Sequence, residues 1–529
     1  MRRALLILLV ASCQPHTALD RPAGGSAPWL REGSSCMACH DRLTTTAGED
    51  VSFGTLWQAS LMANSARDPY WQASMRREVA DHPSATAVIE DECSRCHMPM
   101  ANEHERAAGG TGRVFANLPG QPGADPLAID GVACSLCHQI SSARLGERAS
   151  FSGGFVIAAN TWPVIYGPYD LAPEQASLMQ SALGIKPVRS DHIRQSQLCA
   201  TCHTLYTRTL DPQGHTTGMF AEQVPYLEWQ QSAYRDSQSC QSCHMPAVNE
   251  ATLVASVHGV VRSPVARHDF RGANALVLGM LGRHRSELAV TAPGAALQNS
   301  IATTRAFLTS QAARISIISA ARAGASLAAE IDVENLGGHK LPTAYPARRA
   351  WLHVTVRDGA GRLRFESGKP LATGAIEGND NDLDSARFEP HYAEIQTADQ
   401  VQIYESILGD DQGQVTTGLL QAAHYLKDNR LLPRGFAKAT ALPDTAVHGE
   451  AEHDADFIGG HDRVRYAIDV GDSGPLSLEV ELLYQPIGYR WAHNLEPDKA
   501  SEAQRFVRYF AEMADASVTQ LAHATIVTP

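Results

Sequence analysis

The sequence predicts a two-part fold: a helical and irregular domain, followed by an all-β, sandwich-like domain that closes with a C-terminal helix. Three observations predict this division. Ten of the 11 cysteines form five Cys-x-x-Cys-His boxes before residue 245, separated by long segments that contain many Gly and Pro residues. After about residue 290 cysteine is absent, and apolar and polar residues alternate as they do in half-buried strands. Near the end, Asp498 to about His523 has apolar residues at helical spacing.

The N-terminal residues are predicted to be a targeting segment that takes no part in the fold. Residues 1–12 form the expected signal peptide, with Arg2 and Arg3 before the short apolar run 4–10. The sequence Val-Ala-Ser-Cys, which ends at Cys13, resembles a bacterial lipobox, so we expect this cysteine to be lipidated. The alternative is an ordinary secretory signal. Both interpretations export the chain to the periplasm or cell surface, and the lipobox favours an outer-membrane lipoprotein.

Residues 13–35 are rich in Pro, Gly and Ser, and are predicted to be a flexible tether. No later stretch is apolar over the ~20 residues that a transmembrane helix needs.

Each Cys-x-x-Cys-His box is an attachment signature for c-type haem. The two cysteines bond to the vinyl groups of the porphyrin, and the histidine that follows reaches the iron as proximal ligand. We therefore expect five haem c groups in the domain 36–290. The boxes are Cys36, Cys39 and His40; Cys93, Cys96 and His97; Cys134, Cys137 and His138; Cys199, Cys202 and His203; and Cys240, Cys243 and His244.

Three other chemistries use cysteine pairs, and the pattern disfavours each of them. A structural zinc site takes four ligands, usually from two Cys-x-x-Cys pairs, so five pairs would leave one pair unmatched. Zinc also gives no reason for the histidine that follows each pair. A thioredoxin-like motif is credible once in a chain but not five times. Disulfide frameworks serve small domains with little core, whereas this chain has 529 residues.

Three stretches of the box domain are predicted to be helical. Gln58–Ala80 is expected to be interrupted at Pro69, and Val224–Tyr234 has Pro225 where the start of a helix tolerates it. The third stretch is Asn274–Leu288.

The second domain is predicted to cover residues 316–529, after a linker over 291–315. Period-two patterns predict its strands, and a Gly-containing turn at 358–361 joins two of them. The candidate strands are Ser326–Val333, Trp351–Arg357, Arg362–Glu366, Arg465–Val470 and Leu476–Tyr484.

Each haem iron needs a second axial ligand, and the boxes do not supply it. Five of the 22 histidines are proximal, and most of the others are expected to be ordinary surface or hydrogen-bonded residues. A distal histidine gives a low-potential carrier, a methionine raises the potential, and a vacancy permits substrate binding. The candidate distal ligands are His192, His268, His339 and Met62, and the weaker candidates are His82, His104 and His258.

Several segments resemble the large multihaem cytochrome c group that is related to cytochrome c554. The resemblance covers most of the mature chain and rests on the boxes, Asp130–Cys134, Tyr166–Pro168, Leu198–Leu205 and Glu222–Trp229. It implies a His or Met ligand at Met62, and distal histidines at His268 and His339. Lys427–Pro433 also resembles this group, but the sequence assigns no chemical role to this segment.

The expected function is electron transfer through haem in the cell envelope. One alternative is a reductase of nitrogen or sulfur oxyanions with one open haem, although no box carries the Lys that often marks such a haem in nitrite reductases. Another is a subunit of a polymeric haem filament. We expect redox proteins of the cell envelope as partners, membrane attachment through the lipid anchor, and an oligomer or haem-to-haem contact with other cytochromes. The net charge of −13 disfavours nucleic acid.

The acidic segment 379–384 alternates carboxylates that can bind calcium, but it lacks the Gly and closing Glu of an EF-hand loop. A solvated loop is therefore the favoured interpretation. The sequence contains no nucleotide-binding fingerprint and no convincing nucleophile triad.

Overall fold

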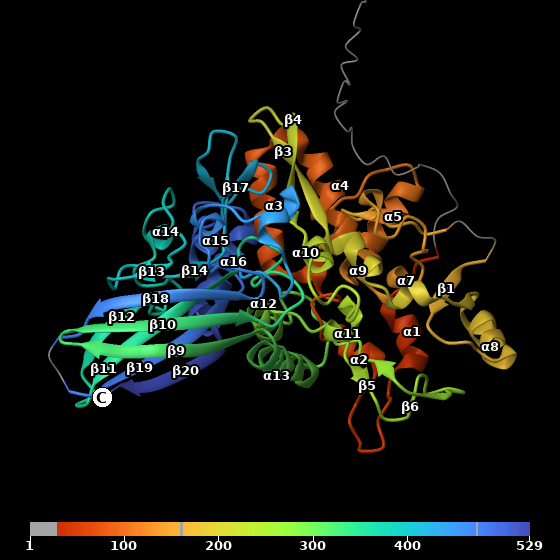
Figure 1. Cartoon of the computed structure of the whole chain (residues 1–529). Coiled ribbons are helices and arrows are strands. Elements are labelled where there is room, and N and C mark those ends of the chain that lie inside the picture. Colours follow the sequence, from red (N-terminus) through yellow and green to blue (C-terminus); the bar gives the residue numbers. More distant parts are fainter. Residues whose placement is uncertain (1–28, 159–161, 472–473, 529) are drawn as a thin grey trace, which may run out of the picture.

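The computed structural model describes residues 29–158, 162–471 and 474–528. Figure 1 shows helices and loops, coloured red to yellow, on one side of the molecule, and sheets, coloured green to blue, on the other. The predicted signal peptide, Cys13 and residues 14–28 of the predicted tether lie outside the described residues. None of the helices in the described ranges combines the length and the apolar character that crossing a membrane requires.

In the first half, each Cys-x-x-Cys-His box coincides with the end of a short helix. Cysteines three residues apart and the histidine four residues after the first lie on one face of a helix, so both thiols and the imidazole project to the same side. The five helices are α1 Gly33–His40, α4 Thr86–His97, α7 Cys134–Cys137, α9 Ser196–His203 and α11 Cys240–His244.

Other short elements pack around these helices. The helices are α2 Phe53–Gln58, α3 Pro69–Asp81, α5 Pro99–Ala107, α6 Pro126–Ile129, α8 Pro173–Leu183, α10 Pro225–Gln230 and α12 Ala275–Arg283. Four two-stranded sheets pair β1 Val164–Gly167 with β2 Lys186–Arg189, β3 Leu205–Leu210 with β4 Thr216–Gln223, β5 Ala247–Val248 with β8 Val265–Ala266, and β6 Thr252–Leu253 with β7 Val261–Arg262.

Of the helix predicted at 58–80, only the part from Pro69 onwards is α-helical; between Gln58 and Pro69 the chain forms turns and the short 3₁₀ helix Ser65–Arg67. Helix α2 ends at Gln58, and α3 starts with Pro69 at its first position. The Asp68 carboxylate caps α3 by accepting the backbone N–H groups of Tyr70 and Trp71 at 2.8 and 3.2 Å. Pro69 thus begins α3, with Asp68 as its N-cap, whereas α2 has already ended at Gln58.

Two sheets pack face to face in the second half, and all five predicted strands are present. Their inner residues, such as Ile331 and Val480, are fully buried and share one core. One sheet has the order β13–β18–β10–β9, and the other has β12–β11–β19–β20 with β14 beside β11. The strands are β9 Ala313–Ala323, β10 Ser326–Asn335, β11 Arg349–Asp358, β12 Leu363–Ser367, β13 Glu394–Ile395, β14 Ile403–Tyr404, β18 His461–Asp469, β19 Leu476–Gln485 and β20 Thr519–Thr528.

A small sheet and three helices complete this half. The sheet contains β15 Ser406–Gly409, β16 Val415–Thr416 and β17 His424–Asp428. The helices are α14 Asp380–Leu383, α15 Tyr489–His493 and α16 Ser501–Met513.

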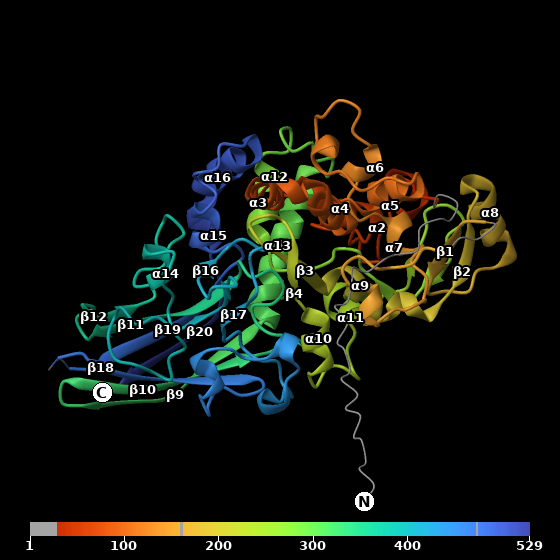
Figure 2. The same cartoon turned by 90° about the horizontal axis from the view of Figure 1, so that it is seen from above.

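The structure corrects three of the predicted boundaries. The predicted linker 291–315 is instead the helix α13 Gly294–Gln311 followed by the start of β9, and α13 stands between the two halves in Figure 2. The predicted C-terminal helix ends at Met513, because residues 519–528 form β20, which pairs with β19. The end of the predicted tether is also folded: Leu30 is 1% exposed, and α1 begins at Gly33.

The two halves share a hydrophobic core, so they are not independent domains. Helix α16 of the second half packs on α3 of the first, with the rings of Phe506 and Tyr70 5.0 Å apart. Arg76 and Glu502 add an ion pair of 2.7 Å between the same helices. This contact holds the sheets against the box half.

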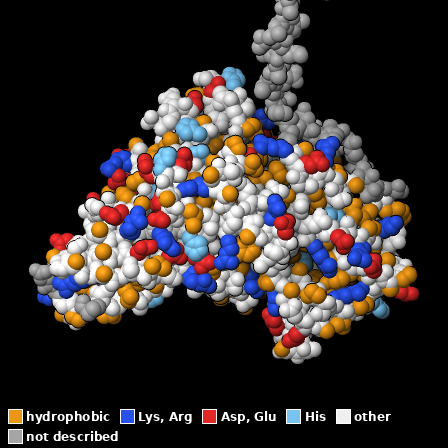
Figure 3. Space-filling view, in the orientation of Figure 1, with side chains coloured by type: hydrophobic (Ala, Val, Ile, Leu, Met, Phe, Trp, Pro, Cys, Tyr) orange, Lys and Arg blue, Asp and Glu red, His pale blue; other side chains and the backbone are white. Residues whose placement is uncertain are grey.

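The acidic segment 379–384 is not the solvated loop that the sequence favours. Part of it forms α14, and Asp382 is buried with its carboxylate 2.8 Å from the Arg349 guanidinium. Elsewhere, acidic and basic side chains are interspersed over the face shown in Figure 3.

Candidate functional site

All five boxes open into one cavity of about 3450 Å³. Both cysteines and the histidine of every box line it, and so do residues of the loop between β10 and β11. Ordinary pockets for one small ligand measure about 300–1,000 Å³, so this space is large enough for several bulky groups.

Four of the five box histidines use Nδ1 to donate a hydrogen bond to a backbone carbonyl. A carbonyl oxygen only accepts, so the proton lies on Nδ1, and Nε2 keeps its lone pair. Metal-bound histidines typically have this arrangement, in which the outer hydrogen bond fixes the ring and its tautomer. The pairs are His40 with Val254 at 2.7 Å, His97 with Ser65 at 3.1 Å, His138 with Tyr166 at 2.6 Å and His244 with Arg271 at 2.5 Å.

Burial keeps the histidines of the second to fifth boxes neutral. It lowers the pKa of His97 and His244 to about 4, because the charged imidazolium loses its hydration. The pKa values of His138 and His203 are lowered for the same reason. Neutral imidazoles retain the lone pair that binds iron, so the residues of the cavity fit c-type haem.

Two candidate distal histidines face box histidines across the cavity. The ring centres of His138 and His268 lie 6.4 Å apart with their planes 12° apart, and those of His244 and His339 lie 6.2 Å apart with planes 13° apart. These distances are too long for a van der Waals stack, in which atoms meet at about 3.5–4.0 Å. Two metal–nitrogen bonds of about 2.0 Å, with each nitrogen about 1.1 Å from its ring centre, separate two imidazole centres by about 6.2 Å.

The outer nitrogens of His268 and His339 are held like those of the box histidines. Nδ1 of His268 donates to the Ala266 carbonyl at 3.1 Å, and Nδ1 of His339 donates to the Lys340 carbonyl at 3.0 Å. Burial also lowers the pKa of His268 to about 4. Both rings therefore offer an Nε2 lone pair to a metal.

The structure contradicts the prediction that His192 is a distal ligand. Its Nε2 donates to the Ile140 carbonyl at 2.8 Å, and its Nδ1 lies 2.6 Å from the Ser190 hydroxyl, so neither nitrogen is free for a metal. This side chain does not line the cavity. His104 also lies outside the cavity lining, with Nδ1 3.8 Å from the Asp125 carboxylate, so its position does not support a ligand role.

The other candidates remain predictions. Met62 and His258 line the cavity, and Met62 packs in a cluster that also contains Cys137 and Cys202. His82 is 2% exposed, and neither of its ring nitrogens has a hydrogen-bond partner among the described residues. A missing metal bond is one explanation for such an unpaired imidazole, but His82 is not among the cavity-lining residues.

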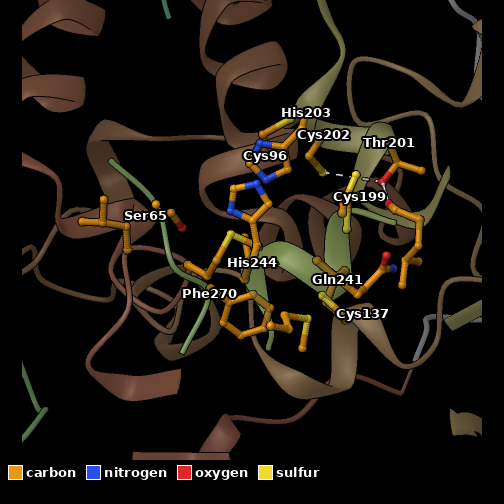
Figure 4. Close-up of a pocket in the computed structure, with 18 of the residues that line it drawn as sticks. Ser65, Cys96, Cys137, Cys199, Thr201, Cys202, His203, Gln241, His244 and Phe270 are labelled. Atoms are coloured by element: carbon orange, nitrogen blue, oxygen red, sulfur yellow. Dashed lines mark hydrogen bonds between the residues drawn. The ribbon is translucent and has the colours of Figure 1, made fainter. Parts of the chain in front are cut away.

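Contacts between thiols show which boxes are neighbours. The Cys36 and Cys134 thiols are hydrogen-bonded, which joins the first box to the third. Cys96 likewise contacts Cys202, and Cys199 contacts Cys240, so the fourth box touches the second and the fifth. Figure 4 shows side chains of the second, third, fourth and fifth boxes converging in one space; those labelled are Cys96, Cys137, Cys199, Cys202, His203 and His244.

Sequence reasoning missed a group of acids and tyrosines that lines the cavity near the second box. Glu222 is 2% exposed, and burial, reinforced by the nearby Glu78, raises the pKa of Glu222 to about 8. Burial also raises the pKa of Glu78 to about 7 and that of Tyr345 well above its usual value. One sequence signal pointed to this group: Glu222 is the first residue of Glu222–Trp229, a segment that carries the resemblance to the multihaem cytochrome group.

A second cluster, His391 with Asp454 and Asp462, has the spacing of a metal site but the wrong tautomer. The amide groups of Gln402 and Asn429 donate to Nδ1 of His391 at 2.9 and 3.1 Å, so its proton lies on Nε2 and points to Asp454 at 3.1 Å. The imidazole thus has no lone pair for a cation, and this cluster is a buried hydrogen-bond network.

Comparisons with known proteins identify the fold. Neither a family model nor a curated protein sequence matches the chain. Among solved structures, a penta-haem cytochrome c552 from Thermochromatium tepidum is similar, with a TM-score of 0.51 and 15% sequence identity. The similarity covers 94% of this chain and 99% of that chain, so it includes both the boxes and the paired sheets. The chain therefore has a multihaem cytochrome fold.

Proposed function

We propose that the chain is a c-type cytochrome of the group related to cytochrome c554, which binds five haems and transfers electrons between partners in the cell envelope. The observation that carries this proposal is the shared cavity, which all five boxes line with their cysteines and histidines. The similarity to a penta-haem cytochrome supports it. When bound, the haems supply closely spaced irons that accept and donate single electrons.

The residues of this chain hold and tune those groups. The ten box cysteines anchor them, and His40, His97, His138, His203 and His244 provide proximal nitrogens. We assign His268 and His339 as distal ligands at the third and fifth boxes, since their rings face His138 and His244 at the separation that one metal gives. Two histidine ligands favour low potentials.

The order of thiol contacts supports a branched relay centred on the fourth box. That box contacts the second and fifth boxes through thiols, and its Cys202 packs in the same cluster as Cys137 of the third. The first box joins through Cys134 of the third. We propose that electrons which enter at any outer box pass through the site of His203.

A second candidate function is reduction of a small substrate at the second or fourth box. Among the described residues, none of His40, His97 and His203 is paired with a candidate distal histidine at the separation seen for the other two pairs, and His97 and His203 belong to the second and fourth boxes, which touch each other. The acidic group with Glu222 lines the cavity near the second box, and its raised pKa keeps it protonated and able to deliver a proton.

Haem content and spin state test both functions. The first requires five covalent haems per chain by mass spectrometry and pyridine haemochrome absorbance, with reversible reduction of all five. A lower content in fully matured protein would contradict it. A high-spin ferric signal that disappears on addition of a small anion would support the second function, and five low-spin haems would exclude it.

The cellular address is also a proposal. The N-terminal sequence supports export and lipidation of Cys13, which would attach the chain to the outer membrane and place it among envelope redox proteins. Cys13→Ala should release the protein from membranes while leaving its haem content unchanged. Retention of this variant on washed membranes would contradict the lipid anchor.

A further inference from the structure

The loop that carries His339 is held directly by a carboxylate of the other half of the molecule. Glu228 lies on α10 and is 0% exposed. One of its oxygens accepts the backbone N–H of Lys340 at 3.0 Å and the hydroxyl of Thr343 at 2.5 Å. Both donors belong to the loop between β10 and β11, within four residues of His339.

Three more buried charges complete this contact. Lys340 Nζ lies 2.7 Å from the Asp428 carboxylate, and Arg430 pairs with the same carboxylate at 2.7 Å. Arg430 Nη1 also lies 3.2 Å from the second oxygen of Glu228. All four side chains are at most 4% exposed, and their two positive and two negative charges balance. We call these four residues the loop lock.

The loop lock forms only while the loop is seated on α10. A buried charge that loses its partner is strongly destabilising, so withdrawing Lys340 or Glu228 leaves the other members uncompensated. The pKa values agree with this coupling: the arginine and lysine beside Asp428 hold its pKa far below the usual range, against the effect of burial.

Close packing leaves the loop little freedom. A Cβ at Gly338 would lie 3.3 Å from the Trp229 ring, so a side chain there would push the loop off α10. The Tyr234 hydroxyl donates to the Leu336 carbonyl at 3.0 Å, and the Asn335 amide donates to the His339 carbonyl at 2.8 Å. The backbone on both sides of His339 is thus held by hydrogen bonds.

We propose that Glu228 is the positioning residue for the distal ligand of the fifth haem, and that the loop lock couples seating of the β-sheet half to coordination of that iron. This inference rests on the proposed function, in which His339 and His244 ligate one iron. It also gives a role to two sequence segments, since Glu228 belongs to 222–229 and both Asp428 and Arg430 belong to 427–433.

The central test replaces Glu228 by Gln in the full haem-loaded protein. The single amide oxygen of Gln can serve the two loop donors or Arg430 but not both, because the amide nitrogen at the other position only donates, and the lost charge leaves Arg430 without one of its anionic partners. We expect the population with His339 off the iron to rise more than tenfold. Electron paramagnetic resonance would detect it as a high-spin ferric signal of up to one haem in five, and added imidazole should restore the low-spin spectrum.

Asp382→Asn is the matched control. It breaks a buried arginine–carboxylate pair of similar length, Arg349–Asp382, but leaves the loop lock intact. We expect it to lower thermal stability without any new high-spin signal. A high-spin signal of equal size in this control would overturn the positioning role, because general loosening would then explain the effect.

Two further variants separate this inference from the proposed function. His339→Ala should convert one haem to high spin, and an unchanged spectrum would refute the ligand assignment itself. If His339→Ala changes the spectrum and Glu228→Gln does not, the assignment of His339 as a ligand is retained and the positioning role of the loop lock is refuted. If Glu228→Gln does not mature, Thr343→Val decides: it removes one loop donor, and a spectrum identical to the wild type would overturn the proposal.

Discussion

The imidazole rings of His138 and His268 lie 6.4 Å apart and nearly parallel, although His138 belongs to the third box and His268 follows the fifth. His138 follows α7, whereas His268 follows β8, and the cavity between them is lined by both. This spacing matches two nitrogens bound to one metal rather than two stacked rings.

His268→Ala should convert one of five haems from low to high spin and raise its potential, because it removes a strong distal donor. His192→Ala is the control, since both nitrogens of His192 are hydrogen-bonded within the protein. Optical spectra and potentiometric titration measure the change. Equal spectra for the two variants would refute the assignment of His268.

His203→Met tests the branched relay. Methionine as an axial ligand raises the potential, so an electron should be held at the fourth box and pass more slowly between the outer boxes. His40→Met places the same change at the first box, which lies at an end of the contacts. Flash-reduction kinetics should show slowed redistribution only for His203→Met. Equal slowing in both variants would argue against a central fourth box.

Glu222→Gln should remove a pH-dependent loss of stability. Burial raises the pKa of Glu222 from 4.5 to about 8, so the folded protein binds more protons than the unfolded chain between these values. Stability therefore falls as pH rises from about 4.5 to 8. The variant should gain thermal stability over the wild type at pH 8 and much less at pH 5. A difference that does not vary with pH would contradict this assignment.

Phe506→Ala should destabilise both halves together. Phe506 is fully buried against Tyr70 in the shared core, and removing such a ring costs about 3–5 kcal/mol. Calorimetry should show one transition at a lower temperature, and Val527→Ala, which changes a 68% exposed side chain, should leave it unmoved. Separate transitions for the box half and the sheets would contradict a common core.

The sequence predicted what depends on local pattern. The boxes, the helix start at Pro69 and the strands predicted at Ser326–Val333 and Leu476–Tyr484 follow from spacing, backbone restriction and alternation. These signals act over a few residues. The multihaem cytochrome fold agrees with the haem interpretation of the boxes.

The parts of the fold and of the candidate site that the sequence did not predict depend on contacts between distant segments. Helix α13 buries only Leu297, Thr304 and Leu308, and the two leucines belong to cores that together draw partners from both halves. Residues 519–528 become a strand because β19 offers an edge. His192 resembled a ligand in sequence, and only the positions of Ile140 and Ser190 show that its nitrogens are engaged.

The packing of α16 on α3 also has a consequence for the order of synthesis. Phe506 can cover Tyr70 only after nearly the whole chain has been made, so until then one side of the core of the box half is incomplete. Attachment of haem requires access to the cysteines, and an incomplete core provides that access. Residues 501–513 are the last segment of that shared core to be made, so the core of the box half is completed only near the end of synthesis.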